Sequence, residues 1–356
     1  MSPVEIGVQF HLPSHKDLSV PQILELGEMA VDGGVKQLWV TDNLQNRGFF
    51  VVLGALAAKL PVKLGAAIMV QYFRNPVDAA GSLAAITELM DRSTELNIGI
   101  GRGNIRTSRF IKTDKPLAMM RETAQVFHQL FAGQPIKGED YPAVAEYFNY
   151  APGAVFSMNV LPNVPIKVYC GGDGPKSLAI GGKFMDGLLC GTTFYPLTKM
   201  GFLEPLLAIF DDAARRAGKT APTRRVAEIK ISLSRDPKAS REFARHGVGS
   251  RVLGLRWRGY SAEDIGRLGI TAEDIDRLEE SKKSNGGTSA ELAPLVTDAM
   301  IDAYYVAGDL GHCRDRLAEV REMAEKHGFH QILLSGVSPN LKEGIKLLSE
   351  EIMPTW

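Results

Sequence analysis

The chain has 356 residues, which is enough for two domains or for one large α/β barrel with insertions. Hydrophobic residues make up 45% of it and charged residues 23%, the composition of an ordinary globular protein. The 41 basic residues balance 41 acidic ones, so the charge argues against a nucleic-acid or membrane partner.

Cysteine usage and the first residues favour a reducing compartment, most simply the cytoplasm. Cys170, Cys190 and Cys313 lie far apart without CxxC spacing, which disfavours a disulfide framework or a zinc site, so we expect no bound metal. The start, M-S-P-V-E-I-G-V-Q-F, lacks the basic and apolar regions of a signal peptide. No apolar run approaches the roughly 18 residues of a membrane span.

Strand-like and helix-like patterns alternate from the first residues onward. Short apolar runs bounded by glycine predict strands, and amphipathic runs predict helices. The predicted strands are 5–10, 36–41, 62–70 and 96–100, and the predicted helices are 20–31, 50–59 and 75–90. Proline at the first turn of the last helix costs little, because its missing N–H has no helical partner there.

The alternation continues after a break in the middle of the chain. A predicted helix at 116–131 is followed by residues 133–164, which are rich in Gly, Pro, Tyr and Asn without a period and predict a long excursion. The later strands are 166–170, 187–190, 227–233 and 331–335, and the later helices are 175–183, 197–217 and 341–352. Eight strands separated by helices predict an α/β fold, a single (β/α)8 TIM barrel spanning 1–356 as one domain.

The stretch between the seventh and eighth strands is too long for one helix, so it predicts a helical and loop insertion over about residues 236–300. Within it, S-A-E-D-I-G-R-L at 261–268 is echoed by T-A-E-D-I-D-R-L at 271–278. Each copy opens with a hydroxyl and then acidic residues, which is typical of a short capped helix. Residues 280–289 predict a solvated linker, with a lid as the alternative.

Two glycine-rich turns fall where strands end, the edge at which barrels of this type place their chemistry. Glycines let the backbone approach a ligand closely. The planar guanidinium of an arginine can form two hydrogen bonds to a phosphate, and free backbone N–H groups at the start of a helix attract an anion. Together the turns predict a site for a phosphorylated cofactor; the alternative is an ordinary turn with a solvated arginine. The predicted cofactor residues here are Arg102, Gly103, Asn104, Gly171, Gly172, Asp173, Gly174, Pro175, Lys176 and Ser177.

Other catalytic patterns are absent from the sequence. It has no G-x-S-x-G elbow, no H-E-x-x-H, no Walker-type loop, and no G-x-G-x-x-G after the first strand. His11 follows the first strand and could face the site, whereas His128 lies in a predicted helix and is interpreted as structural. A partly aromatic set of strand-end residues predicts a pocket for a small molecule: Phe10, Leu12, Gln71, Tyr72, Phe194 and Tyr195.

Five segments follow one another along the predicted barrel: W-V-T-D-N-L-Q-N-R-G, G-A-A-I-M-V-Q-Y-F-R-N-P, G-I-G-R-G, G-G-D-G-P-K-S-L-A and L-L-S-G-V-S-P-N. Together they resemble the bacterial-luciferase-like superfamily of flavin-dependent oxidoreductases, including its methylenetetrahydromethanopterin reductase branch. The resemblance implies a bulge with a non-prolyl cis peptide at or near Ala67–Ile68, so that Ala67, Ile68 and Met69 lie behind the flavin ring. It also implies that Arg102 and the 171–177 turn contact the cofactor phosphate.

One position departs from the family pattern. Many members carry a histidine after the acidic residue that ends strand two, where this chain has Asn43 after Asp42. Asparagine can hydrogen-bond but cannot move a proton, so Asp42, His11 or a substrate group would have to replace it in acid–base chemistry.

The resemblance implies a flavin-dependent oxidoreductase, first of all a monooxygenase that uses reduced FMN and oxygen on a small organic substrate. The alternative is hydride transfer with the deazaflavin F420. The W-V-T-D-N-L-Q-N-R-G and G-G-D-G-P-K-S segments favour F420, while G-I-G-R-G favours FMN. A non-catalytic flavin-binding barrel is a third hypothesis. A homodimer or higher homo-oligomer is expected, and a flavin reductase could supply reduced FMN.

Overall fold

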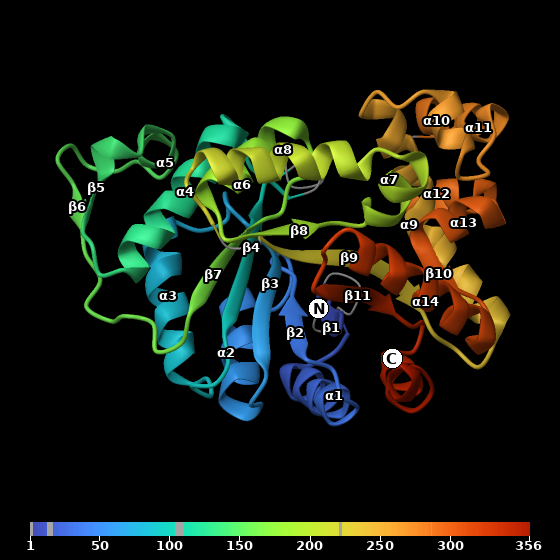
Figure 1. Ribbon diagram of the computed structural model, residues 1–356, viewed down its shortest axis with the longest axis horizontal. Helices are drawn as coiled ribbons and strands as arrows, with labels where there is room; N and C mark the ends of the chain where they lie inside the picture. Colours follow the sequence, from blue (N-terminus) through green and yellow to red (C-terminus); the bar gives the residue numbers. More distant parts are fainter. Residues whose placement is uncertain (1–2, 13–16, 104–109, 221–222, 286) are drawn as a thin grey trace.

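Eight parallel strands form a closed barrel at the centre of the molecule, as the sequence predicts (Figure 1). The computed structural model describes residues 3–12, 17–103, 110–220, 223–285 and 287–356. The strands pair in the order β9-β11-β1-β2-β3-β4-β7-β8, and β8 pairs back with β9 to close the ring. Their bounds are β1 Glu5–Phe10, β2 Gln37–Val40, β3 Lys63–Val70, β4 Leu96–Gly101, β7 Ile166–Cys170, β8 Gly187–Cys190, β9 Arg224–Ser232 and β11 Gln331–Val337.

Helices cover the outside of the barrel, because each parallel crossover has to return its chain across the outer face. The covering helices are α1 Val20–Asp32, α2 Phe49–Lys59, α3 Pro76–Glu88, α4 Pro116–Phe131, α6 Pro175–Phe184, α7 Phe194–Met200, α8 Leu203–Arg216, α14 Leu310–Lys326 and α15 Leu341–Leu347. The two ends of the chain meet, since the Trp356 indole N–H donates to the Val4 carbonyl at 2.7 Å. In the described residues no helix is long and apolar enough to cross a membrane.

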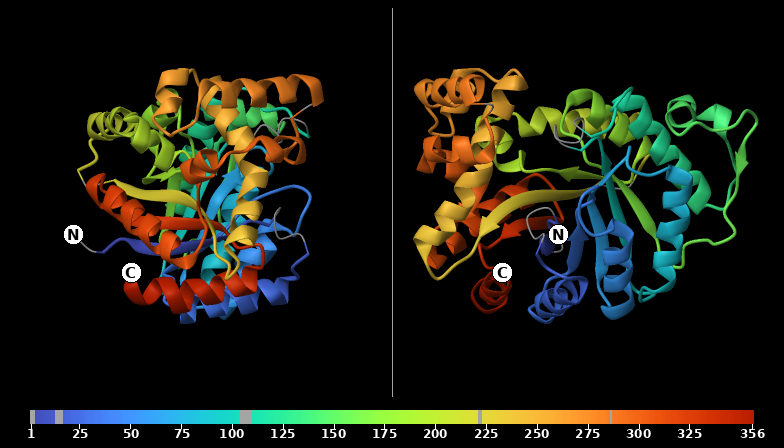
Figure 2. Two further views of the ribbon diagram at one scale, coloured as in Figure 1. Left: turned by 90° about the vertical axis from the view of Figure 1, so that its right-hand side faces the viewer. Right: turned by 180° about the vertical axis from the view of Figure 1, so that it is seen from behind.

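Two additions to the barrel lie on opposite sides of the molecule, on the left and on the right in Figure 1 (see also Figure 2). The 133–164 excursion carries the hairpin of β5 Ile136–Lys137 and β6 Val155–Phe156, with the short helices η2 Gly138–Asp140 and α5 Pro142–Tyr147. Between β9 and β11 the chain forms a helical lobe. Its elements are α9 Pro237–Trp257, α10 Ala262–Gly266, α11 Ala272–Asn285, α12 Ser289–Leu292, η3 Ala293–Leu295, α13 Asp298–Tyr304 and β10 Tyr305–Ala307.

Several predicted elements need correction. The predicted linker at 280–289 is wrong for its first part, because α11 continues to Asn285. The predicted helix at 197–217 is two helices, since Gly201 adopts a left-handed φ of 84° between α7 and α8. The predicted helix at 341–352 is α15 followed by a π turn, η4 Leu348–Ile352, and the 3-10 turn η5 Met353–Thr355. The sequence analysis did not predict α9 or α14.

The barrel interior has an apolar layer and, nearer the amino-terminal ends of the strands, a polar layer. Trp39, Tyr169, Leu189 and Leu333 pack in the apolar layer. A Cβ at Gly65 would lie 2.4 Å from Trp39 Cε3, so glycine is needed to make room for the indole. Near the amino-terminal ends of the strands the buried amides of Gln37, Asn97 and Gln331 hydrogen-bond to one another and to the Trp39 N–H. This end of the barrel is therefore closed by side chains, which leaves the carboxyl ends of the strands as the candidate location of a ligand site.

Candidate functional site

The third strand is irregular where it reaches the open end of the barrel. The peptide between Ala67 and Ile68 is cis, at the position that the resemblance implies, and the pairing with β4 shifts between Ala66 and Met69. The Ala67 carbonyl accepts a hydrogen bond from Gln9 Nε2 at 2.5 Å. The Ile68 carbonyl accepts one from the backbone N–H of Asp42 at 3.2 Å. Neighbouring strands therefore hold the bulge in one conformation.

Asp42 holds the far side of the same bulge. Its carboxylate is fully buried, accepts a hydrogen bond from the Val70 N–H at 3.2 Å, and lies 2.6 Å from Arg74 Nη1. Burial raises the pKa of Asp42, and Arg74 opposes this rise without cancelling it. The Arg74 guanidinium lies over the rings of Phe49 and Phe50, at 5.6 and 5.0 Å. Because every observed contact of Asp42 is internal, we interpret it as a positioning residue and not as an acid or base.

The Ile68 side chain fits into a socket made of glycines from two adjacent strands. A Cβ at Gly171 would lie 2.6 Å from Ile68 Cγ2, and one at Gly101 would lie 2.8 Å from Ile68 Cδ1. At Gly99 the corresponding distance to Ile68 Cγ2 is 3.3 Å. These glycines serve packing as well as ligand approach, a role that the sequence analysis did not assign to them.

The structure brings the two glycine turns together. Strands β4 and β7 are neighbours, and the Gly171 N–H donates to the Ile100 carbonyl at 2.8 Å. Arg102 is exposed at the end of β4, and Gly103 has a left-handed φ of 80°. The predicted cofactor residue Asn104 lies outside the described residues.

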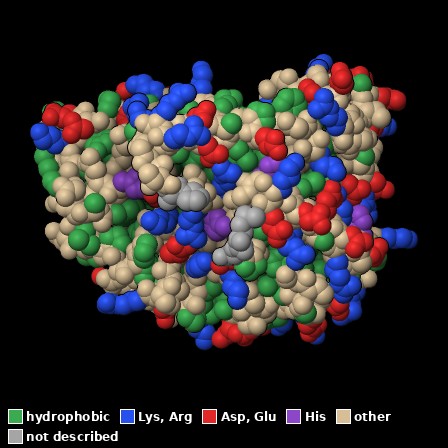
Figure 3. All heavy atoms as spheres, viewed as in Figure 1, with side chains coloured by type: hydrophobic (Ala, Val, Ile, Leu, Met, Phe, Trp, Pro, Cys, Tyr) green, Lys and Arg blue, Asp and Glu red, His purple; other side chains and the backbone are tan. Residues whose placement is uncertain are grey.

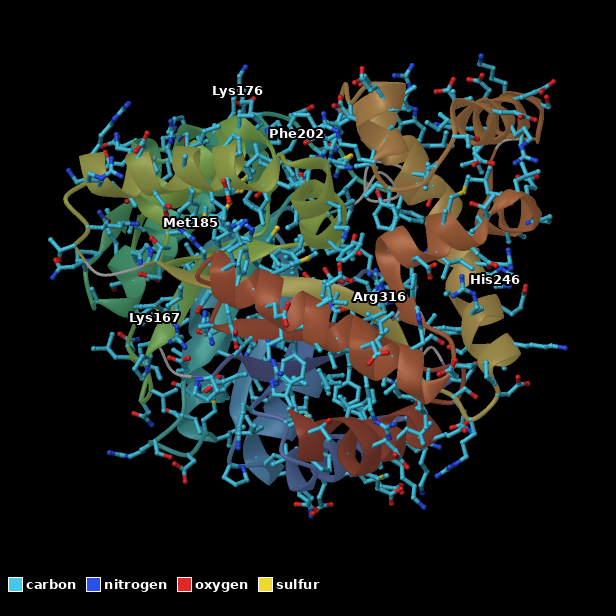
Figure 4. All side chains as sticks on the ribbon, turned by 45° about the vertical axis from the view of Figure 1, so that its right-hand side comes forward. Lys167, Lys176, Met185, Phe202, His246 and Arg316 are labelled. Carbon is cyan, nitrogen blue, oxygen red and sulfur yellow. The ribbon has the colours of Figure 1, made fainter. Side chains whose placement is uncertain are left out.

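The second turn leads directly into α6. Gly174 is the N-cap and Pro175 the first helical residue, so the backbone N–H groups of Lys176 and Ser177 lack helical partners. The Lys176 side chain is exposed, and Figure 4 shows it projecting outward from the start of α6. We therefore assign the anion-binding potential of this turn to its backbone N–H groups, not to the lysine ammonium.

Asp173 connects the same turn to the helical lobe. Its Oδ2 lies 3.0 Å from Arg258 Nη2, just past the end of α9, and accepts a hydrogen bond from Thr193 Oγ1 at 3.3 Å. The paired arginine offsets a negative charge that would otherwise oppose anion binding here. Figure 3 shows a notch in the outline of the molecule between the barrel helices and the lobe, and the Arg258–Asp173 ion pair places the lobe beside the second glycine turn.

Buried amide atoms near the mouth lack hydrogen-bond partners within the described residues. They are Gln9 Oε1 after the bond to Ala67, Asn43 Nδ2 and Gln71 Oε1. A buried polar atom without a partner costs free energy, and such atoms are expected where a ligand completes the bond. The three atoms lie at the carboxyl ends of β1, β2 and β3, and they include one donor and two acceptors. His11, the other candidate at this edge, is partly buried directly after β1.

Three of the predicted pocket residues face elsewhere. Phe10 and Leu12 are fully buried in the layer between the barrel and the helices, because Gln9 faces inward and the next residue of a strand faces outward. Phe194 is also buried there, with its ring 4.8 Å from that of Phe329. The expectation that these side chains line the pocket is therefore wrong.

Tyr195 and Tyr72 are also engaged by the protein. The Tyr195 hydroxyl hydrogen-bonds to Glu319 at 3.3 Å and accepts from Arg316, which lies on α14 (Figure 4). Tyr195 therefore belongs to the outer helix layer, and its assignment to the pocket is corrected too. The Tyr72 hydroxyl donates to the Asp114 carbonyl at 2.7 Å. Of the predicted pocket set, Gln71 has the side chain best placed to meet a ligand.

Sequence reasoning missed a charged cluster on the opposite wall of the mouth. Glu228 and Lys230 on β9 face inward beside Ser335 on β11, with Ser335 Oγ 2.8 Å from Glu228 Oε1 and 3.3 Å from Lys230 Nζ. A signal was present in the sequence, since A-E-I-K-I-S-L alternates charged and apolar residues in a strand that should be buried on both faces.

The structure is a (β/α)8 barrel whose candidate functional site lies at the carboxyl ends of its strands. The chain belongs to the luciferase-like monooxygenase family, whose model matches residues 4–332, and is a luciferase-like oxidoreductase. It is 26% identical, over 99% of both chains, to a 5,10-methylenetetrahydromethanopterin reductase of Archaeoglobus fulgidus.

Two further similar proteins are named for the coenzyme F420. An F420-dependent glucose-6-phosphate dehydrogenase of Rhodococcus hoagii is 26% identical over 63% of this chain and 68% of its own. The solved structure of the F420-dependent tetrahydromethanopterin reductase of Methanopyrus kandleri superposes with a TM-score of 0.75, covering 99% of both chains at 20% identity. The structural likeness confirms the fold.

Proposed function

We propose that the protein is an F420-dependent oxidoreductase that transfers hydride between the deazaflavin and a small organic substrate. The observation that carries this proposal is the match to a methylenetetrahydromethanopterin reductase along the whole of both chains. F420 is also the coenzyme named for a dehydrogenase relative with another substrate. FMN is the first expectation from the sequence, but the relatives support the alternative, F420, better. An FMN-dependent monooxygenase remains the second candidate, favoured by G-I-G-R-G.

The residues at the mouth fit a deazaflavin ring. The pyrimidine edge of such a ring presents both N–H donors and carbonyl acceptors. Gln9 Oε1, Asn43 Nδ2 and Gln71 Oε1, which have no hydrogen-bond partner among the described residues, offer the complementary set. Ile68, held in its glycine socket, would give the ring an apolar platform. These four residues would therefore bind and orient the ring.

The phosphate of the coenzyme would bind at the paired glycine turns. Arg102 would supply its planar, positively charged guanidinium, and the start of α6 would supply backbone N–H groups. This arrangement suits the phosphate of either FMN or F420, so it supports a phosphorylated coenzyme without distinguishing the two.

When bound, F420 would supply or accept the hydride at the substrate carbon. The chain has to hold the substrate against the ring, exclude water and manage any proton. Asn43 cannot move a proton, and Asp42 is bound to Arg74 and Val70. A proton group would therefore be His11, directly after β1, or a group on another wall of the mouth.

The test is a parallel titration of the purified protein with F420 and with FMN, followed by fluorescence quenching. We expect F420 to bind at least about tenfold more tightly, a difference of about 1.4 kcal/mol. Arg102→Ala should weaken F420 binding at least about tenfold, because a charge-assisted contact to phosphate is lost. Arg92→Ala is the matched control: both arginines are exposed and flank β4, but Arg92 lies at the closed end. Failure to bind F420, or tighter binding of FMN, would contradict the proposal.

Two expectations accompany this proposal. Turnover of a substrate with bound F420 would separate the enzyme from the third hypothesis, a non-catalytic coenzyme-binding barrel. Self-association as a homodimer stays a prediction, which sedimentation equilibrium would test.

A further inference from the structure

Glu228, Ser335 and Lys230 form a directed hydrogen-bond chain inside the barrel mouth. The Lys230 ammonium donates to Ser335 Oγ at 3.3 Å, and the Ser335 hydroxyl donates to Glu228 Oε1 at 2.8 Å. Register explains the grouping, because Lys230 pairs with Ser335 between β9 and β11. Glu228 lies two residues before Lys230 and so faces the same side. The chain runs from a buried cation to a carboxylate.

Only the carboxylate end of this chain is open to the mouth. Ser335 is fully buried and Lys230 is 7% exposed, whereas Glu228 is partly exposed. Glu228 Oε2 lies 3.8 Å from where a Cβ would stand on Gly191, at the end of the neighbouring strand β8. Gly191 therefore leaves space beside the carboxylate for a ligand atom.

Lys230 has an environment that suits a proton donor. It faces Glu228 on its own strand, Ser335 on β11, the Tyr305 ring on β10 at 5.7 Å, and Arg251 of α9. Its ammonium has the Ser335 hydroxyl as a hydrogen-bond partner in the described part of the chain. Burial and Arg251 lower the pKa of Lys230 to about 8, although Glu228 opposes the shift. An ammonium with this pKa can release a proton near neutral pH.

The backbone directly after Ser335 is strained. Val337 has a φ of 64°, a left-handed conformation that a β-branched residue rarely adopts, and Gly336 before it has a φ of 91°. Strained residues of this kind cluster at functional sites, where the surrounding structure has to hold them. Here the strained residues end β11, directly after Ser335, whose hydroxyl lies between the charged side chains of Glu228 and Lys230 on β9.

We propose that Lys230, Ser335 and Glu228 form a proton relay that ends at the substrate. This inference rests on the proposed hydride transfer, and the substrates it implies carry a heteroatom on the reacting carbon. The Lys230 ammonium gives a proton to Ser335 Oγ while the Ser335 hydroxyl proton passes to the Glu228 carboxylate, which becomes a carboxylic acid. As hydride adds to the reacting carbon, the bonding pair between carbon and heteroatom moves to the heteroatom, which takes this proton from Glu228 and leaves Glu228 a carboxylate again. Lys230 becomes a neutral amine and is reprotonated from solvent; oxidation of a substrate reverses each transfer.

Three variants of the full chain separate a relay from a structural charge cluster. Lys230→Arg keeps the positive charge but cannot release a proton near neutral pH. Ser335→Ala breaks the chain and keeps both charges. Lys63→Arg is the matched control, because Lys63 is also a lysine on a barrel strand but lies at the closed end, where its ammonium is 3.0 Å from Glu5.

The first measurement does not depend on turnover. The protein is labelled with ¹³C at lysine Cε and at the glutamate carboxyl carbon, and both signals are titrated by NMR, with Lys230→Arg assigning the lysine signal. We expect Lys230 to titrate near pH 8 with a matching inflection at Glu228. This coupling should weaken in Ser335→Ala and persist in Lys63→Arg. A Lys230 pKa near the ordinary 10.4 of lysine would overturn the relay.

The second measurement uses methylenetetrahydromethanopterin and reduced F420 as probes. We expect kcat to fall at least about tenfold in Lys230→Arg and Ser335→Ala, with the wild-type limb near pH 8 lost from the Lys230→Arg profile. F420 affinity and the melting temperature should stay near the wild-type values. Wild-type kcat with an unchanged pH limb in Lys230→Arg would overturn the proposal. If F420 binds but this probe is not turned over, the NMR titration decides alone. If F420 does not bind, the proposed function fails separately.

Discussion

Replacing Arg74 with leucine tests whether the ion pair beneath the β3 bulge holds the site together. Arg74 Nη1 lies 2.6 Å from both carboxylate oxygens of Asp42, whose side chain is fully buried. Leucine preserves an apolar contact with the Phe50 ring but leaves the carboxylate without its cation. Breaking a buried pair from one side costs about 3–5 kcal/mol, so we expect a loss of this size in the free energy of unfolding near neutral pH.

The sign of the pH dependence follows from the pKa of Asp42. Burial already raises this pKa, and loss of Arg74 removes the main opposing influence, so it rises further in the variant. A carboxyl whose folded pKa exceeds its unfolded pKa stabilises the fold below the unfolded value, and this stabilisation is lost as the pH rises through the folded value. The deficit of Arg74→Leu relative to wild type should therefore be smaller near pH 5 than near pH 8.

Urea unfolding at about pH 5 and about pH 8, followed by circular dichroism, measures both effects. The double variant Asp42→Asn, Arg74→Leu should recover at least half of the loss at the higher pH, because no buried charge remains unpaired. A loss below about 1 kcal/mol, or an equal loss at both pH values, would refute the reasoning.

Two further predictions concern packing and pH. Gly171→Ala should lower the free energy of unfolding by about 1–3 kcal/mol and weaken coenzyme binding, because the new Cβ would lie 2.6 Å from Ile68 Cγ2. The control is Gly81→Ala, in an open part of α3, which should be neutral or stabilising in thermal melts. Burial lowers the pKa of His330 to about 4, below its unfolded value, so up to about 3 kcal/mol of stability should be lost as the pH falls from about 6.5 to about 4. The same urea series on His330→Asn should show a flatter profile; an unchanged slope would contradict this assignment.

The pattern of residues along the chain was enough for the architecture. Eight short apolar segments alternating with amphipathic ones predicted the barrel, since strand and helix periods are local properties of the sequence. The resemblance also placed the cis peptide at Ala67–Ile68. The residue pattern was too weak to predict α9 as a helix. It also did not predict that a glycine would divide one predicted helix into α7 and α8.

The direction of side chains and the pairing of charges were decided only by the tertiary structure. Strands of a parallel barrel are buried on both faces, so the sequence could not show that Phe10 faces outward while Gln9 faces the mouth. Asp42 meets Arg74, and Lys230 meets Ser335, across large separations along the chain that strand register brings together. The sequence by itself determined the barrel and the positions of its two glycine-rich turns. The closed sheet decided which polar groups remain available for chemistry.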